Sequence, residues 1–236
     1  MSDKPISELM YAPPQVYSAV VTDRWGSTET TLVNDGQTWT LGLRGRTFSG
    51  ETLDGLDLVS PLSRSAEPLP DLDDGTLCSY TLEWRMPIRV LLLVGAAGAG
   101  RGSGRIMAPL DCRLVLGPEL GPGGAPKEDL VLALRLPTGA VATRRVHGFF
   151  DDALLDLQRQ IAGRARIEAC ITCAFGSFQP GGGGLIGTMG CFRDCKDAYR
   201  AVRSKSERFA IWGRKTGYVQ ETFHCPQYEP DKSTTR

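Results

Sequence analysis

The chain has 236 residues, in which 27 lysines and arginines balance 27 aspartates and glutamates. This length can bury a hydrophobic core without disulfide staples, and the balanced charge excludes a general electrostatic attraction to nucleic acid or anionic membranes. The first residues lack the basic and apolar regions of a secretory signal, and the longest apolar run, Val90 to Ala97, is too short to span a bilayer. We therefore expect a cytoplasmic protein with reduced thiols and no membrane partner.

The charges are unevenly distributed along the chain. Residues 51–75 contain seven acidic residues and one arginine, whereas residues 193–215 contain eight lysines and arginines and three acidic residues. Two solvated faces account for this pattern without any partner. The alternative is that the basic stretch 193–215 binds an anion or a nucleic acid.

Residues 16–150 are predicted to form a β-rich region that follows a flexible arm, residues 1–15. Short segments rich in valine, threonine and tryptophan alternate with turns, of which the Asn-Asp-Gly at residues 34–36 is the clearest. The acidic, proline-containing segment 51–74 is expected to be a surface connection. Because this region shows no convincing helix, we expect a β-sandwich or a strongly bent antiparallel sheet.

The first convincing helix is predicted at residues 151–163. Apolar residues repeat there at helical spacing, with Asp151 as the expected N-cap and Gly163 as the expected stop. Further along, the patterns predict a strand at 166–175, a short basic helix at 193–205, a strand at 218–225 and a disordered tail at 230–236.

A glycine-rich loop follows the predicted strand that ends near Val94. Its Gly95-x-x-Gly98-x-Gly100 spacing is similar to a dinucleotide-binding turn, in which backbone N–H groups cradle phosphate at the start of a helix. No helical pattern and no Lys-Ser/Thr pair follows these glycines. We therefore expect a hairpin connection up to Ile106 and no nucleotide site.

Four of the seven cysteines lie within the stretch from Cys170 to Cys195. The Cys170-x2-Cys173 spacing lets two thiols bind one tetrahedral Zn²⁺, and 17 residues separate Cys173 from Cys191, a separation usual between the ligand pairs of zinc ribbons. Cys225 precedes a proline at the end of a predicted strand. We predict a structural zinc site formed by Cys170, Cys173, Cys191 and Cys225.

Other interpretations of the cysteines stay open. Cys195 lies inside the predicted basic helix. If one of the four ligands is misassigned, Cys195 is the first substitute and His224 the second. The remaining alternatives are scattered buried thiols and a redox pair at Cys170 and Cys173. The expected fold class is α+β, predominantly antiparallel β, with one or two helices. Residues 151–229 are expected to form a subdomain that the zinc ion stabilises.

Few residues are candidates for catalysis. The chain has two histidines, and His147 is the first candidate for an acid or base because its ordinary pKa is near ~6.5. Glu221, on the predicted strand before Cys225, is the second candidate. Both also fit structural roles, His147 as a histidine before a helix and Glu221 as a strand residue facing solvent.

The C-terminal third, from about Ile167 to Pro230, resembles an uncharacterised bacterial family. The strings that carry the resemblance are "ACITCAF", "GLIGTMGCFRD", "SKSERFAIW" and "GYVQETFHCPQYEP". In that pattern the cysteines that match Cys170, Cys173, Cys191 and Cys225 recur, whereas the position of Cys195 is not typically cysteine. The overall plan is also similar to peptide maturases of crocagin-type ribosomal-peptide pathways.

The resemblance implies a function in the maturation of a bacterial ribosomal peptide, either as a peptide-modifying or cyclising enzyme or as its partner. The alternatives are a non-catalytic scaffold that binds peptides or proteins, and an anion or nucleic-acid binder. The expected partners are a precursor peptide or other pathway proteins. Exposed edges of long strands also favour a homodimer, because edges need cover.

Overall fold

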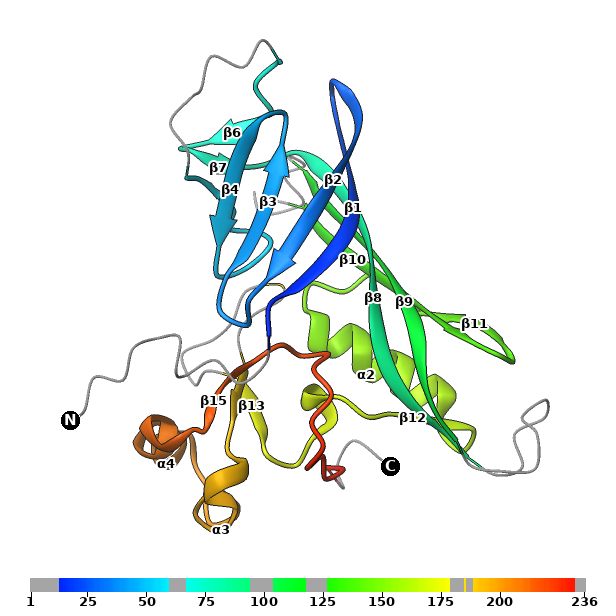
Figure 1. The fold of residues 1–236 in the computed structure, drawn as a ribbon, viewed down its shortest axis with the longest axis vertical. Coiled ribbons are helices and arrows are strands. Elements are labelled where there is room, and N and C mark those ends of the chain that lie inside the picture. Colours follow the sequence, from blue (N-terminus) through cyan, green and yellow to red (C-terminus); the bar gives the residue numbers. More distant parts are fainter. Residues whose placement is uncertain are drawn as a thin grey trace.

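The structure is a computed structural model that describes residues 13–59, 67–93, 104–117, 127–178, 185 and 189–231. Figure 1 shows one large, strongly bent antiparallel sheet, with α2 (Phe150–Ile161) beside its lower half and the C-terminal region below it. The predicted bent antiparallel sheet is therefore confirmed. The glycine loop before Ile106, most of the N-terminal arm and the end of the tail lie outside the described residues.

Within the described residues, twelve strands form the large sheet, in the order β11-β10-β9-β8-β1-β2-β3-β4-β5-β7-β6, with β12 pairing to β8. Their bounds are β1 (Gln15–Asp23), β2 (Gly26–Asn34), β3 (Trp39–Leu43), β4 (Arg46–Gly50), β5 (Asp57–Leu58), β6 (Leu72–Asp73), β7 (Thr76–Leu77), β8 (Tyr80–Leu92), β9 (Gly104–Gly117), β10 (Lys127–Leu136), β11 (Gly139–Ala142) and β12 (Ala165–Ile167).

The C-terminal region holds a three-stranded sheet and two short helices. These strands are β13 (Gly176–Phe178), β14 (Met189–Cys191) and β15 (Gly217–Val219), and the helices are α3 (Lys196–Arg200) and α4 (Lys205–Ile211). Three 3₁₀ turns complete it: η1 (Cys170–Thr172), η2 (Arg193–Cys195) and η3 (Trp212–Arg214). No helix among the described residues is long and apolar enough to cross a membrane.

The core lies on one face of the large sheet because the long strands alternate strictly. In β8, every second side chain from Tyr80 to Val90 is buried, whereas Glu83, Arg85 and Pro87 on the opposite face are exposed. The apolar face joins one hydrophobic cluster with the buried side of α2. Each fully buried large side chain contributes about 1.5–3 kcal/mol, so this cluster stabilises the whole sheet.

The turn between β2 and β3 forms as its residue types predict. The N–H of Gly36 donates to the side-chain oxygen of Asn34 at 2.7 Å, and Gly36 has a φ of 93°. This backbone conformation is favourable for glycine alone, so the turn sets the register in which Asn34 pairs with Trp39.

The helix predicted at residues 151–163 exists, but Asp151 is not its N-cap. The helix begins at Phe150, whose N–H donates to the carbonyl of Leu185 at 2.9 Å, so a tertiary partner replaces a side-chain cap. Asp151 lies in the first turn, where a negative charge interacts favourably with the helix dipole. Gly163 follows the helix with a φ of 78°, as expected for a stop signal.

A third helix, α4, was not predicted. Ser204 accepts a hydrogen bond from the N–H of Glu207 at 3.2 Å, and the carboxylate of Glu207 accepts from the N–H of Ser204 at 3.2 Å. This reciprocal capping box is visible in the sequence as Ser-x-x-Glu and was the signal that could have found the helix. The described residues therefore contain three α-helices, more than the one or two predicted.

Three segments differ from their predicted structure. The strand predicted at 166–175 ends at Ile167, after which the chain turns into η1, and the strand predicted at 218–225 ends at Val219. A turn follows there because the N–H of Phe223 donates to the carbonyl of Gln220 at 3.1 Å. The segment 51–74 is not only a surface connection, since its leucines 53 and 56 are fully buried.

Candidate metal centre and binding groove

The four cysteines predicted as zinc ligands come from three neighbouring segments. Cys170 begins η1 and Cys173 follows it, with the N–H of Cys173 donating to the carbonyl of Cys170 at 3.1 Å. Cys191 ends β14, which pairs with both β13 and β15. Cys225 lies in the segment after β15, whose Phe223 carbonyl accepts from the N–H of Cys170 at 2.9 Å. The turn at Cys170, the end of β14 and the segment after β15 therefore lie next to one another.

The thiols are close enough to influence each other's ionisation. Burial raises the pKa of Cys170 well above its usual range, and the nearby Cys191, Cys173 and Cys225 raise it further. Burial also raises the pKa of Cys191, to about 11, with Cys225 and Cys173 adding to the rise. Three of the four thiols belong to one buried cluster with Met189 and Val219.

Two of the sulfurs accept backbone hydrogen bonds from the residue two positions later. The N–H of Gln227 donates to Cys225 Sγ at 3.3 Å, and the N–H of Arg193 donates to Cys191 Sγ. A hydrogen bond to the charged form favours that form, so the contact from Arg193 opposes the rise in the pKa of Cys191 that burial causes. Thiolates are the form of cysteine that binds metal.

The proposed substitute ligands lie elsewhere. Cys195 Sγ is 3.3 Å from the carbonyl oxygen of Arg214, to which it donates, and His224 Nδ1 is 2.9 Å from Arg89 Nη1. As the thiols stand, no three His, Cys, Asp or Glu side chains of the described residues are arranged to hold a metal ion. The structure thus gathers the four cysteines without closing their sulfurs on a single point.

His147 is held in a structural setting. It is 6% exposed, its backbone pairs with Leu130, and its Nε2 lies 3.5 Å from Asp156 Oδ2 on α2. Burial works to raise the pKa of Asp156, but hydrogen bonds from Arg144 and His147 outweigh it and lower that pKa. His147 therefore links β10 to α2, and its catalytic role stays a prediction.

Glu221 lies between the cysteine cluster and β1, and its prediction as a solvent-facing strand residue is wrong. It is 2% exposed, and its charge adds to the rise in the pKa of Tyr17 and of Cys170, which burial causes in the first place. His147 and Glu221 contact different elements, so the structure does not present them as one acid–base pair.

A wedge opens in the large sheet where β1 leaves β8. β1 pairs with β8 only from Thr81 to Trp84, and β12 pairs with β8 only from Val90 to Leu92. Just before the β12 pairing, the N–H of Glu168 donates to the carbonyl of Arg89. In the part of the chain that the structure describes, residues 85–88 of β8 pair on the β9 side alone. Two adjoining cavities of about 740 and 470 Å³ lie here, and Ser18 and Arg85 line both.

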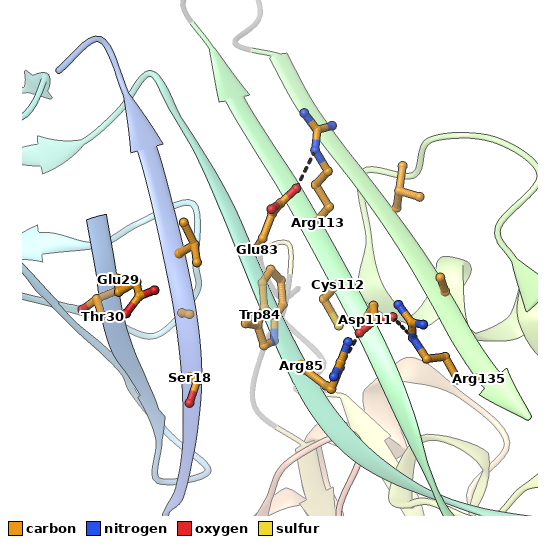
Figure 2. Close-up of a pocket in the computed structure, with 14 residues that line it drawn as sticks. Ser18, Glu29, Thr30, Glu83, Trp84, Arg85, Asp111, Cys112, Arg113 and Arg135 are labelled. Carbon is orange, nitrogen blue, oxygen red and sulfur yellow. Dashed lines mark hydrogen bonds and ion pairs between the residues drawn. The ribbon is translucent and has the colours of Figure 1, made fainter. Parts of the chain in front are cut away.

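The larger cavity is lined by a ladder of ion pairs across β8, β9 and β10 (Figure 2). Arg113 Nε lies 3.2 Å from Glu83 Oε1, and Arg85 Nε lies 2.5 Å from Asp111 Oδ1. Arg135 contacts the other oxygen of Asp111. Burial works to raise the pKa of Asp111, but these two arginines outweigh it and lower that pKa.

Trp84 lies where the wedge closes, between β1 and β8 (Figure 2). It is 4% exposed, and its buried indole N–H has no hydrogen-bond acceptor among the described residues. Leaving such a donor unsatisfied costs about 1–3 kcal/mol. The smaller cavity beside it exposes two apolar side chains: Val16 is 66% and Met107 58% exposed.

Sequence reasoning missed this groove. Pro87 pairs with Pro109 inside two long strands, although proline cannot donate to a sheet ladder and is normally restricted to edges and bulges. Pro87 was therefore the available sequence signal that β8 has an open side, since its missing N–H faces away from β9. The distance between β1 and β8 itself depends on the bend of the sheet, which no local pattern encodes.

The sequence analysis also did not predict a cluster of charged residues around Glu168. Glu168 is buried, and Arg105 Nε lies 2.7 Å, Arg89 Nε 3.4 Å and Arg166 Nη2 3.2 Å from its carboxylate. Burial works to raise the pKa of Glu168, but Arg105 and Arg166 outweigh it and lower that pKa. The cluster joins the β8–β9 hairpin to β12 and, through His224, to the C-terminal segment.

These features define a class: a β-rich α+β protein with a bent antiparallel sheet, an open groove on that sheet and a cluster of four cysteines below it. A family model described as a family of unknown function, DUF6304, matches residues 15–176. The chain therefore belongs to the DUF6304 family. Searches of the curated proteins and of the solved structures found no significant match. The family match covers the groove, α2 and two of the four clustered cysteines, Cys170 and Cys173.

Proposed function

We propose that this protein binds an extended peptide in the wedge between β1 and β8, and that it acts in the maturation of a bacterial ribosomal peptide. The observation that carries the proposal is the stretch 85–88 of β8, which is exposed to a cavity on one side and pairs with β9 on the other. An extended peptide can add to such an edge through main-chain hydrogen bonds.

The register of β8 indicates which groups the peptide would meet. The carbonyl of Arg89 points toward β12, since it accepts from Glu168. Alternate residues of a strand direct their polar groups to the same side, so Arg85 and Pro87 also direct theirs into the wedge. The last pair between β1 and β8, Ala19 with Trp84, uses the N–H of Arg85 as a donor to the carbonyl of Ser18. Arg85 and Pro87 therefore each offer a carbonyl, and the peptide would donate N–H groups to both.

The side chains of the groove favour a peptide with mixed chemistry. Apolar peptide side chains would cover Val16 and Met107, and polar ones would meet the ion pairs around Asp111. These contacts support binding rather than a specific reaction, so a partner of a modifying enzyme, or the non-catalytic scaffold, fits as well as the enzyme itself.

The proposal includes a structural zinc ion on the four cysteines. Zn²⁺ binds four thiolates tetrahedrally at about 2.3 Å, and such a closed site supplies folding energy rather than catalysis. Support comes from the mutual influence of the thiols and from the N–H donors at Cys191 and Cys225. Binding requires the sulfurs to approach one another further.

The anion-binding alternative has less support. Lys196 and Arg200 both contact Glu229 and lie over the ring of Phe175, and Lys215 lies over two aromatic rings. Several charges of the basic stretch 193–215 therefore serve internal contacts. A homodimer through exposed sheet edges stays a prediction, which the mass in solution would test.

Short peptides encoded beside the gene, made synthetically, test the proposal. Val16→Asp and Met107→Asp should weaken peptide binding at least tenfold, because a charge in the apolar part of the wedge must be desolvated. Val59→Asp is the matched control, since Val59 is 60% exposed and does not line the wedge. Equal binding by all three variants would contradict the site. A change in peptide mass that disappears in His147→Ala would indicate catalysis.

A further inference from the structure

The arginine cluster around Glu168 carries more positive than negative charge. Three guanidinium groups, from Arg89, Arg105 and Arg166, share one carboxylate that is 2% exposed. An arginine can only donate, so His224 Nδ1 accepts the contact from Arg89, and the neutral ring carries its proton on Nε2. The histidine therefore supplies no negative charge, and two positive charges remain uncompensated within the cluster.

The surplus charge is open to solvent. The side chain of Arg105 is 56% exposed, and those of Arg166 and Arg89 are 27% and 21% exposed. Arginine presents a planar fork of N–H groups that matches the oxygens of a carboxylate or a phosphate. An anion that arrives from solvent can therefore reach Arg105 first and then approach the two less exposed guanidinium groups.

The cluster lies at the end of the groove. On β8 and β9, Pro87 is opposite Pro109, and the next pair whose side chains point to the same face is Arg89 and Met107. Two residues along a strand span about 7 Å. Arg89 thus lies one side-chain step beyond Pro87 and directly opposite Met107, so a single extended peptide of a few residues can reach both the cluster and the apolar residues of the wedge.

We infer that Arg89, Arg105 and Arg166 bind an anionic group of the ligand, a carboxylate or a phosphate, at the end of the wedge. This inference rests on the proposed peptide binding. It specifies the ligand as a peptide with apolar residues followed by an acidic side chain, a terminal carboxylate or a phosphorylated residue. It also gives the peptide a direction in the groove, because only one end of the wedge carries the surplus charge.

The cluster also has a structural role, since it joins the β8–β9 hairpin to β12. Arg105→Gln separates the two roles, because Arg89 and Arg166 keep their contacts with Glu168 in this variant. Arg24→Gln is the matched control: the side chain of Arg24 is 59% exposed and pairs with a carboxylate, that of Asp71, at 3.1 Å. Both variants remove one exposed arginine from one ion pair.

The first arm of the test uses small anions. Calorimetric titrations with inorganic phosphate and with acetate should show binding to the unmodified protein and to Arg24→Gln, and at least tenfold weaker binding to Arg105→Gln, because a charge-assisted contact is lost. A preference for phosphate or for acetate identifies the source of the anion. The same affinity in all three proteins would overturn the inference.

The second arm uses two peptides that differ at one position: acetyl-Val-Thr-Val-Thr-Val-Glu-amide and the same peptide with Gln in place of Glu. The unmodified protein should prefer the Glu peptide at least tenfold, and Arg105→Gln should abolish the preference. Equal binding of both peptides by the unmodified protein would overturn the anion site and leave the groove intact. Binding of phosphate that depends on Arg105, without binding of either peptide, would keep the anion site and contradict the groove.

Discussion

The large sheet and the C-terminal region are stabilised in different ways. The sheet shares one continuous hydrophobic cluster with α2, built from long strands with an apolar face. The C-terminal region has strands of three residues and two small clusters, one of them made largely of cysteines. A core of that size orders few residues by burial alone. The comparison indicates that the sheet can leave part of a strand open for a ligand, whereas the C-terminal region needs a further stabiliser.

Removal of zinc should have the largest effect, and it should affect one region only. We expect about one zinc per chain, and chelation should destabilise the C-terminal region by up to about 10 kcal/mol, since metal binding there is folding energy. Hydrogen exchange should rise sharply in residues 189–231 and remain low in β8 and β9. Elemental analysis that finds well under half an equivalent of zinc would contradict the metal site.

Single cysteine variants sharpen the assignment of the ligands. Serine at Cys170, Cys173, Cys191 or Cys225 should abolish zinc binding, because three thiolates leave the tetrahedral site incomplete. Cys195→Ser is the control within the same region and should keep the metal at a cost of about 1 kcal/mol. Cys78→Ser and Cys112→Ser should cost only packing. Release of zinc by Cys195→Ser and retention by Cys191→Ser would show that the ligand set is wrong.

A cavity made by mutation in the main hydrophobic cluster should destabilise the large sheet. Phe150→Ala should lower the free energy of unfolding by about 3–5 kcal/mol, because Phe150 is 2% exposed and packs in the main cluster. Phe209→Ala is the control, since Phe209 is 53% exposed and should change stability by less than about 0.5 kcal/mol. Urea unfolding of the zinc-loaded protein measures both. Similar values for the two variants would mean that the main cluster does not stabilise the sheet.

Loss of the cap of α4 should have a smaller, local effect. Ser204→Ala should destabilise α4 by about 1 kcal/mol, because the N–H of Glu207 loses its acceptor. Ser204→Asp keeps an acceptor and should restore most of the stability. Exchange of the amide hydrogens in α4 reports the change, and unchanged exchange in Ser204→Ala would show that the capping box does not stabilise this helix.

The smallest expected effect is a pH dependence of the contact between β10 and α2. The pKa of Asp156 is lowered in the folded protein by Arg144 and His147 against the opposing effect of burial. Its contribution to stability is therefore present above its unfolded pKa and is lost as the pH falls through the lower folded value. The difference in unfolding free energy between the unmodified protein and Asp156→Asn should shrink from about pH 6 to pH 3. A difference that grows on acidification would contradict this sign.

Much of the fold follows from local sequence patterns. Strict alternation in β8, the Asn34 turn and the apolar spacing of α2 each depend on neighbouring residues, and all three agree with the structure. The cysteine spacing likewise singled out four thiols that the fold brings close together. The capping box of Ser204 was a local signal as well, and α4 could have been predicted from it.

The groove and the arginine cluster follow from long-range geometry instead. The wedge exists because β1 pairs with β8 over four residues and then diverges, which depends on the bend of the whole sheet. The cluster exists because the β8–β9 register places Arg89 opposite Met107, near β12 and His224. No single segment carries either piece of information, so the sequence alone could not predict these sites.

Hydrogen exchange at the amides of the bound peptide tests the central claim most directly. A peptide added as a strand would donate N–H groups to the carbonyls of Arg85 and Pro87, which point into the wedge, so exchange of those peptide amides should slow at least tenfold on binding. The amide of Met86 points toward β9 and serves as the reference within the protein, with little change expected. Peptide binding that leaves the exchange of every peptide amide unchanged would show that the peptide does not extend the sheet at β8.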